Sequence, residues 1–399
     1  MVKIRRIRAK NFRCIKDACL DLGDITVLFG PNGAGKSTWL DTLWFVRDCC
    51  IRGVPEASAD RSHGIGMLWS RSPSDAGLGL SLETDRLAYT LTFDFENGRI
   101  DPLPSELLED HITEDRATLY SRRSGSTSIT AFSENGSEAI VTLQDPEKLG
   151  LSSYLGLASA KQYAHELDFV LRHTRYYDSR VAALFELRRL GSDSDYRTVL
   201  WSPRAQNLWS VLRNLNDKRI LDDRYSRIIH HMREAFPDFN DIVLEQTGPQ
   251  SVYGGFMLKD MERPINASGV SSGHLQMLIH LTALFSDSDG NEPFILFDEP
   301  ECSLHPHALA ALAEAMKEAA GVRGRQIVIA THSPVLLSQF DPENIVAVEK
   351  DEDGSTKVQR IASQPGMKEL LEEYAAGSLY MSEAIAPQGV LSDLRRTVD

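Results

Sequence analysis

A short apolar run leads directly into a glycine-rich turn, and together they read Ile25-Thr26-Val27-Leu28-Phe29-Gly30-Pro31-Asn32-Gly33-Ala34-Gly35-Lys36-Ser37. The turn fits the pattern G-x-x-x-x-G-K-[ST], and apolar residues at helical spacing follow it from Thr38 to Val46. Backbone N–H groups can wrap phosphate oxygens closely only where no Cβ blocks the approach, which is why glycines are needed. The order of strand, turn and helix therefore predicts a phosphate-binding loop.

The polar side chains of this loop have separate roles in the prediction. Lys36 supplies a positive charge for the β- and γ-phosphates of a nucleotide, and the Ser37 hydroxyl supplies a ligand for Mg²⁺. The N-terminal end of the following helix adds positive potential. The predicted nucleotide contacts are Gly30, Pro31, Asn32, Gly33, Ala34, Gly35, Lys36, Ser37 and Thr38.

A second apolar run, over residues 294–297, ends in two carboxylates, Asp298 and Glu299. Such a run is typical of a buried strand. Asp298 at the strand end would hold Mg²⁺, while Glu299 would point to the other side and polarise a water for attack on a γ-phosphate. The alternative interpretation is that Asp298, Glu299 and Pro300 only close the strand with a turn.

Two weaker signals lie nearby in the sequence. The small residues from Ser271 to Gly273 open the apolar helix expected over 275–285, where free N–H groups can bind an anion, although an ordinary N-cap by Ser271 or Ser272 explains the same residues. His332 follows the apolar run 327–330, and a histidine at the carboxyl end of a strand can reach a nucleotide bound at that sheet edge. An ordinary surface histidine is the alternative.

The order of these signals resembles the ABC-type ATPase heads of the RecF and structural-maintenance-of-chromosomes (SMC) class. In that class Ser271 and Gly273 correspond to the signature motif, Asp298 and Glu299 to the Walker B motif, and His332 to the switch histidine. More narrowly, two segments are similar to the OLD-like ATPases of prokaryotic phage-defence systems. They read Asp298-Glu299-Pro300-Glu301-Cys302-Ser303-Leu304-His305-Pro306 and Ala330-Thr331-His332-Ser333-Pro334.

The resemblance implies an α/β P-loop NTPase head that uses ATP and Mg²⁺, with Glu299, His332 and Lys36 as the catalytic residues. It also implies a head-to-head homodimer or higher oligomer, in which two ATP molecules lie between the P-loop of one protomer and the signature of the other. A lid glutamine is expected between these motifs, and Gln144 is the candidate. OLD nucleases carry a C-terminal nuclease domain, but too few residues follow Ser333 to form one. We therefore expect an ATPase head that acts on a separate effector protein, such as a nuclease.

The expected organisation has four parts. Residues 1–146 form the N-terminal half of the head with the P-loop and a β lobe, and residues 147–240 form an inserted helical, arginine-rich lobe. Residues 241–362 form the C-terminal half of the head with the signature, Walker B and switch histidine, and residues 363–399 form a C-terminal helical tail.

The charge distribution leaves a second function open. The net charge of −14 excludes a uniformly basic nucleic-acid binder, yet residues 172–233 hold twelve arginines and Lys218 against seven acids. A RecF-like repair ATPase that binds DNA through this lobe is the alternative function, and a solvated helical surface or a protein-docking face is the simpler interpretation of the lobe. No run approaches the roughly 18 apolar residues of a membrane span. The five cysteines form no C-x-x-C pair, which favours reduced thiols and a cytoplasmic protein.

Overall fold

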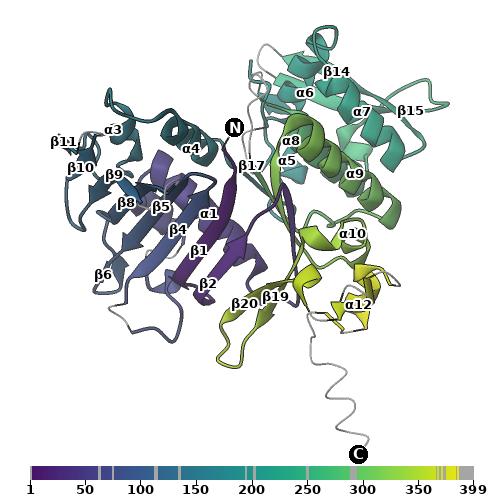
Figure 1. Cartoon of the computed structure of the whole chain (residues 1–399). Helices are drawn as coiled ribbons and strands as arrows, with labels where there is room; N and C mark the ends of the chain where they lie inside the picture. The colour runs from purple at the N-terminus through teal and green to yellow at the C-terminus, as the bar shows by residue number, and fades with distance from the viewer. Residues whose placement is uncertain are drawn as a thin grey trace, which may run out of the picture.

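The structure is a computed structural model that describes residues 2–61, 64–73, 76–111, 116–133, 136–193, 196–200, 204–248, 251–287, 294–364, 366–367, 370–371, 374–382 and 384–385. A six-stranded sheet in the order β12-β17-β18-β3-β19-β20 forms its centre (Figure 1). The strands are β3 (Ile25–Phe29), β12 (Arg175–Asp178), β17 (Phe294–Asp298), β18 (Gln326–Thr331), β19 (Ile345–Lys350) and β20 (Thr356–Arg360). All pairings are parallel except that of β20 with β19. The carboxyl ends of the five parallel strands therefore meet at one edge.

Both faces of β3, β17 and β18 are buried, and the side chains of the sheet divide between two cores. In β3, Val27 and Phe29 belong to one core and Leu28 to the other. In β17, Phe297 and Leu296 divide in the same way. A strand covered on both faces needs apolar residues at every position, which explains the continuous apolar runs.

An eight-stranded sheet in the order β11-β10-β9-β8-β5-β4-β1-β2 lies on one side of the central sheet. Its strands are β1 (Ile4–Phe12), β2 (Ile15–Asp21), β4 (Leu78–Thr84), β5 (Leu87–Phe93), β8 (Ser105–Asp110), β9 (Ala117–Arg122), β10 (Ser128–Phe132) and β11 (Glu138–Thr142). With it lie α1 (Lys36–Ile51), α2 (Val54–Ala59), α3 (Leu151–Leu155), α4 (Gln162–Arg172), the short pair β6 (Phe95–Glu96) and β7 (Arg99–Ile100), and the 3-10 turn η1 (Ile65–Met67). Side chains of this sheet, α1, α3 and α4 share one core with one face of the central sheet.

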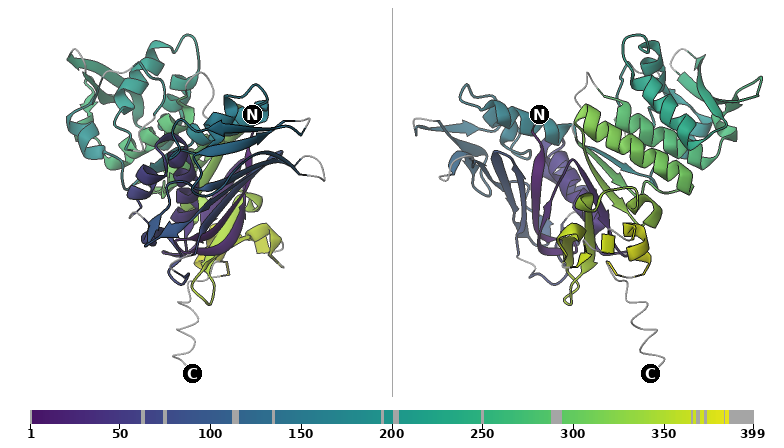
Figure 2. Two further views of the ribbon diagram at one scale, coloured as in Figure 1. Left: turned by 90° about the vertical axis from the view of Figure 1, so that its left-hand side faces the viewer. Right: turned by 45° about the vertical axis from the view of Figure 1, so that its right-hand side comes forward.

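A helical layer covers the other face (Figure 2). It contains α5 (Leu184–Arg189), α6 (Leu208–Asp217), α7 (Arg224–Ala235), α8 (Ser272–Phe285), α9 (Pro306–Arg323), α10 (Pro334–Leu337) and α12 (Ala376–Met381). A small sheet lies at its rim, made of β13 (Ser192–Asp193), β14 (Phe239–Gly248), β15 (Ser251–Leu258) and β16 (Ile265–Asn266). The remaining turns are η2 (Ala267–Gly269), η3 (Pro342–Asn344) and η4 (Ile361–Ser363). Within the described part of the chain, no helix is both long and apolar enough to cross a membrane.

The segment expected as one inserted helical lobe, residues 147–240, differs from that expectation in its packing. Its first helices, α3 and α4, pack into the core of the eight-stranded sheet, whereas α6 and α7 pack with α8 and α9. Between them β12 is a strand of the central sheet. The amphipathic pattern of α4 does not specify which core its apolar face will join. The sequence therefore suggested one helical unit, whereas in the structure the segment contributes to the eight-stranded sheet's core, to the central sheet and to the helical layer. The expected helical tail, 363–399, contains α12, and much of the rest lies outside the described residues.

Candidate nucleotide-binding site

The glycine-rich loop joins the end of β3 to the start of α1. Gly30 has φ 152° and Gly35 has φ 113°, so both adopt backbone conformations that side chains disfavour. A Cβ on Gly30 would lie 2.0 Å from the carbonyl oxygen of Val348, and one on Gly35 would lie 2.4 Å from Oγ1 of Thr356. The glycines are thus required by the packing of the loop against β19 and β20, in addition to any need for phosphate access.

Lys36 lies almost completely buried beneath this loop. Its Nζ donates hydrogen bonds to the carbonyl oxygens of Gly30, at 2.8 Å, and Pro31, at 3.0 Å. The same atom is 3.3 Å from Nδ1 of His332. Burial lowers the pKa of Lys36 to about 8, and the negative charge of Asp298 opposes that shift. The Lys36 ammonium group is therefore held at the carboxyl ends of the parallel strands, although its burial there costs free energy of desolvation.

Ser37 and Asp298 meet across the sheet edge although they are far apart in the sequence. Ser37 Oγ donates to Asp298 Oδ1 at 3.0 Å, and Tyr176 Oη donates to Asp298 Oδ2 at 3.0 Å. Burial raises the pKa of Asp298, while these two hydrogen bonds favour its charged form. A hydroxyl and a carboxylate in contact are the oxygen ligands that Mg²⁺ prefers, so the two residues fit the predicted metal role.

Glu299 and His332 lie at the ends of neighbouring strands, β17 and β18. Glu299 Oε1 is 3.7 Å from His332 Nε2. The main chain of His332 is held by Glu301, whose Oε1 accepts hydrogen bonds from Thr331 Oγ1 at 2.8 Å and from the His332 N–H at 2.7 Å. Burial lowers the pKa of His332, and neighbouring Lys36 lowers it further, which favours the neutral imidazole. The structure thus brings together Lys36, Ser37, Asp298, Glu299 and His332.

Three residues at this edge were not predicted from the sequence: Tyr176, Asp178 and Arg180. The Arg180 guanidinium lies 3.2 Å from Asp298 Oδ2 and 3.5 Å from Glu299 Oε1, and its Nε donates to Asp178 Oδ1 at 3.0 Å. These carboxylates raise the pKa of Arg180. Tyr176 and Asp178 belong to β12, a four-residue strand with the sequence Arg-Tyr-Tyr-Asp. Because the strand begins and ends with a charged residue and contains no continuous apolar run, the sequence pattern did not indicate a strand here.

The predicted signature residues lie at the start of α8. Ser271 is the N-cap of this helix, and its side chain accepts from the His274 N–H, as the N-cap interpretation expects. A Cβ on Gly273 would lie 2.6 Å from the carbonyl oxygen of Ser303, so the helix start packs tightly on the turn after β17. Among the described residues, no hydrogen bond or ion pair joins Ser271 or Gly273 to the P-loop of the same chain. Their nucleotide contact stays a prediction.

Gln144 follows β11, the edge strand at the far end of the eight-stranded sheet from β2. Its side chain is exposed. No hydrogen bond joins it to the P-loop within the described part of the chain, and its assignment as a lid glutamine stays a prediction.

Residues 25–338 match a protein family described as "AAA domain, putative AbiEii toxin, Type IV TA system". Over 70 residues the chain is 41% identical to Protein ea59 of Escherichia phage lambda, covering 18% of this chain and 13% of that protein. Over 40 residues it is 50% identical to the OLD nuclease of Thermus scotoductus, covering 10% of this chain and 8% of that protein. Over 81 residues it is 33% identical to the Old nuclease of Escherichia phage P2, covering 20% of this chain and 14% of that protein. The chain thus matches only a small part of the length of each relative.

Solved structures share the fold over most of the chain. An SMC head bound to the C-winged helix domain of ScpA gives a TM-score of 0.50 at 14% identity, covering 89% of this chain and 97% of that one. The Smc head domain with an extended coiled coil, bound to the C-terminal domain of ScpA and derived from Pyrococcus furiosus, gives 0.51 at 12% identity, covering 94% and 100%. The predicted α/β P-loop NTPase fold is confirmed.

Proposed function

We propose an ATP-hydrolysing function for this chain, which belongs to the protein family described as AAA domain, putative AbiEii toxin, type IV TA system. It is an ABC/SMC-like ATPase related to OLD proteins. The observation that carries the proposal is the 3.0 Å contact between Ser37 of the P-loop and Asp298 at the end of β17. It places the phosphate-binding loop beside an acidic strand end, with Glu299 as the next residue.

The residues of this edge have separate roles in the proposed reaction. Ser37 and Asp298 would hold Mg²⁺, which supplies neutralising charge to the β- and γ-phosphates. Lys36 binds phosphate oxygens in place of its loop carbonyls. A water attacks the γ-phosphorus and gives its proton to Glu299, while the bond from that phosphorus to the bridging oxygen breaks and releases ADP and phosphate. His332, which lies between Lys36 and Glu299, senses the γ-phosphate.

We further propose that two chains form an ATP-dependent head-to-head dimer. Arg188 of α5 supports the signature segment, because its Nη2 donates to the Val270 carbonyl at 2.9 Å and to Ser272 Oγ at 3.1 Å. The same helix and its flanks expose apolar side chains, with Phe185 68% and Leu190 73% exposed. Exposed apolar surface beside a phosphate-binding helix start fits a second copy of this chain as its partner.

The proposed output is control of a separate effector, such as a nuclease, in anti-phage defence. Its support is the sequence similarity to two OLD nucleases, which is confined to 10% and 20% of this chain. The cytoplasm is the proposed location, since ATP is available there and all five cysteines are free.

DNA binding through the arginine-rich segment remains the alternative function. Many of its arginines already contact carboxylates, which reduces the positive charge available to DNA phosphates. The contacts include Arg172–Asp168, Arg180–Asp178, Arg204–Glu186, Arg224–Asp287 and Arg227–Asp223. DNA affinity that falls steeply with salt concentration would favour this alternative.

Phosphate release from ATP by purified wild-type chain and by Glu299→Gln tests the proposal. The amide cannot accept the proton, so kcat should fall roughly 10²- to 10⁴-fold while ATP affinity is kept. Glu352→Gln, at an exposed turn between β19 and β20, is the matched control and should hydrolyse ATP like the wild type. Equal hydrolysis by wild type and Glu299→Gln would defeat the assignment.

A further inference from the structure

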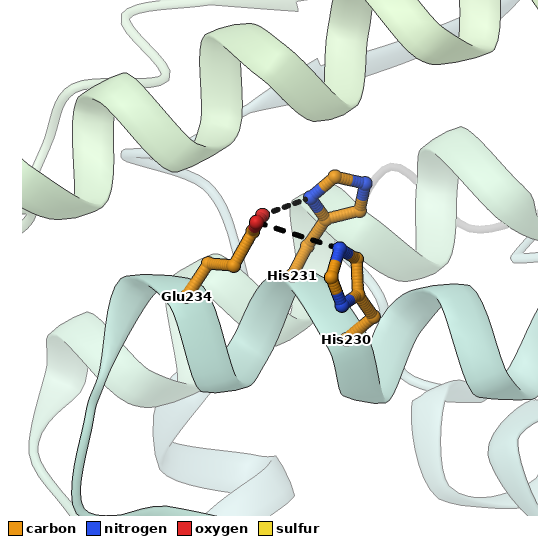
Figure 3. Close-up of side chains that lie close together, drawn as sticks. All are labelled: His230, His231 and Glu234. Atoms are coloured by element: carbon orange, nitrogen blue, oxygen red, sulfur yellow. Dashed lines mark hydrogen bonds and ion pairs between the residues drawn. The ribbon is translucent and has the colours of Figure 1, made fainter.

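Two histidines and a glutamate converge on one face of α7, in the helical layer and outside the nucleotide site (Figure 3). They are His230, His231 and Glu234. One ligand atom from each lies within 4.8 Å of the others. His230 and Glu234 are one helical turn apart, so they share a face of the helix, and the imidazole of His231 turns toward the same carboxylate.

The spacing of these atoms is close to that of a metal's ligand shell. His231 Nδ1 is 2.9 Å from Glu234 Oε2, and His230 Nε2 is 3.4 Å from Glu234 Oε1. Ligands at about 2.0–2.1 Å from a tetrahedral Zn²⁺ lie about 3.3 Å from one another. The side chains need only small movements to take up that geometry.

The hydrogen bonding of His231 supplies an independent observation. Its Nε2 is 2.9 Å from Oε2 of Glu318, on α9, and Arg227 contacts the other oxygen of Glu318. A carboxylate only accepts hydrogen bonds, so Nε2 must carry a hydrogen, and a neutral imidazole has only one. In the neutral imidazole Nδ1 then presents a lone pair to the Glu234 carboxylate, so the 2.9 Å contact is favourable only with a second proton on Nδ1 or a metal ion bound by both groups.

A carboxylate that fixes one nitrogen of a histidine while the other nitrogen binds a metal is the usual outer shell of protein zinc sites. Glu318 has this position here, and Arg227 in turn orients Glu318. The side chain of His231 is 4% exposed and that of His230 is 64% exposed. One ligand of the cluster is therefore fixed in the protein interior, and the other side of the cluster is open to solvent, from which an ion can enter.

We propose that His230, His231 and Glu234 form a binding site for a divalent transition-metal ion of the Zn²⁺ class, with Glu318 orienting His231. Two imidazole nitrogens and one carboxylate oxygen are a donor set that suits Zn²⁺, and solvent can supply the fourth ligand. The ion would connect α7 to α9 through His231 and Glu318. Since α7 also packs on α8, the site would stiffen the layer that carries the signature segment. The competing occupant is a proton, which would let His231 donate to both carboxylates.

Zn²⁺ binding to the purified chain, after removal of bound metal with a chelator, tests this proposal without nucleotide. The variants are His230→Ala and Glu234→Gln, both at solvent-accessible side chains. The matched controls are His165→Ala on α4 and Glu314→Gln on α9, which are exposed and outside the cluster. Circular dichroism verifies that each variant is folded.

The wild type and both controls should bind one equivalent of Zn²⁺ that His230→Ala and Glu234→Gln lose. Co²⁺ in its place should give the visible bands of tetrahedral coordination. Glu318→Gln should keep the site but weaken it about 10- to 100-fold. Failure of the wild type to bind Zn²⁺, or equal binding by cluster variants and controls, would overturn the proposal and assign the cation to a proton. Neither result depends on ATP hydrolysis.

Discussion

Lys36 holds a positive charge where water is largely excluded, and the groups around it offset only part of the desolvation cost. The carbonyl oxygens of Gly30 and Pro31 solvate its ammonium group, and Asp298 attracts it, yet burial still lowers its pKa to about 8 from an ordinary 10.5. The folded chain binds this proton less tightly than the unfolded chain, so the contribution of Lys36 to stability rises as the pH goes from about 8 to above 10.5. A nucleotide triphosphate bound at the P-loop would raise the pKa of Lys36 again, because its negative charge favours the ammonium form.

ATP binding should therefore take up a proton at Lys36 near pH 8. With a pKa of about 8, roughly half of the free chains carry a neutral Lys36 at that pH, and phosphate charge should return these to the ammonium form. Calorimetry in buffers of different ionisation enthalpy should give an uptake of about half a proton per ATP at pH 8 and nearly none at pH 6.5. Lys36→Arg, which stays protonated at both values, should show no such difference. Equal uptake by wild type and Lys36→Arg would place the titrating group elsewhere.

Arg180 contacts the carboxylates of both Asp298, at Oδ2, and Glu299, at Oε1. Arg180→Ala should lower kcat about 10²-fold and change KM much less, because the guanidinium positions the carboxylates and not the adenine or ribose. Steady-state hydrolysis measures both quantities. Arg219→Ala, at an exposed position after α6, should behave as the wild type. A raised KM with unchanged kcat would mean that Arg180 serves only substrate binding.

Among the secondary-structure elements, the strands that are buried on both faces could be predicted from the sequence. In β3, β17 and β18 every position is buried, so the apolar runs were complete and their ends could be aligned at one edge. The strand β12 was missed because it pairs only with β17 at the sheet border and carries polar atoms at each of its positions. Arg180, two residues beyond it, was consequently grouped with a surface of arginines. The pattern of apolar residues along the chain indicates which segments are buried. It does not indicate which strand a short edge strand such as β12 will pair with, because that pairing depends on the tertiary fold.

The P-loop packs tightly on β19 at Gly30. Gly30→Ala should destabilise the chain by about 1–3 kcal/mol, because its Cβ would lie 2.0 Å from the Val348 carbonyl oxygen. Gly321→Ala in α9, where a Cβ meets nothing within 4 Å, should stabilise by about 0.5–1 kcal/mol. Urea denaturation compares the two variants. Equal stability of Gly30→Ala and wild type would show that the loop is not held against β19.

At the level of the whole molecule, no hydrogen bond or ion pair joins Ser271 or Gly273 to the P-loop within the described part of the chain. We propose that a second copy of the chain brings the two segments together. Light scattering should give about 44.5 kDa for Glu299→Gln alone and twice that mass with ATP and Mg²⁺. Phe185→Asp in the same background should stay at the single-chain mass, since it charges the proposed contact surface. An ATP-independent mass for Glu299→Gln would contradict the dimer.

In the proposed function, Lys36, Ser37 and Asp298 enclose one site for ATP with Mg²⁺. Equilibrium binding of ATP to wild type and Asp298→Asn, each with and without Mg²⁺, measures this most directly. Mg²⁺ should strengthen ATP binding to the wild type, and Asp298→Asn should lose this gain while it retains the metal-independent affinity. The same gain from Mg²⁺ in both proteins, or no ATP binding by the wild type, would contradict the proposed site.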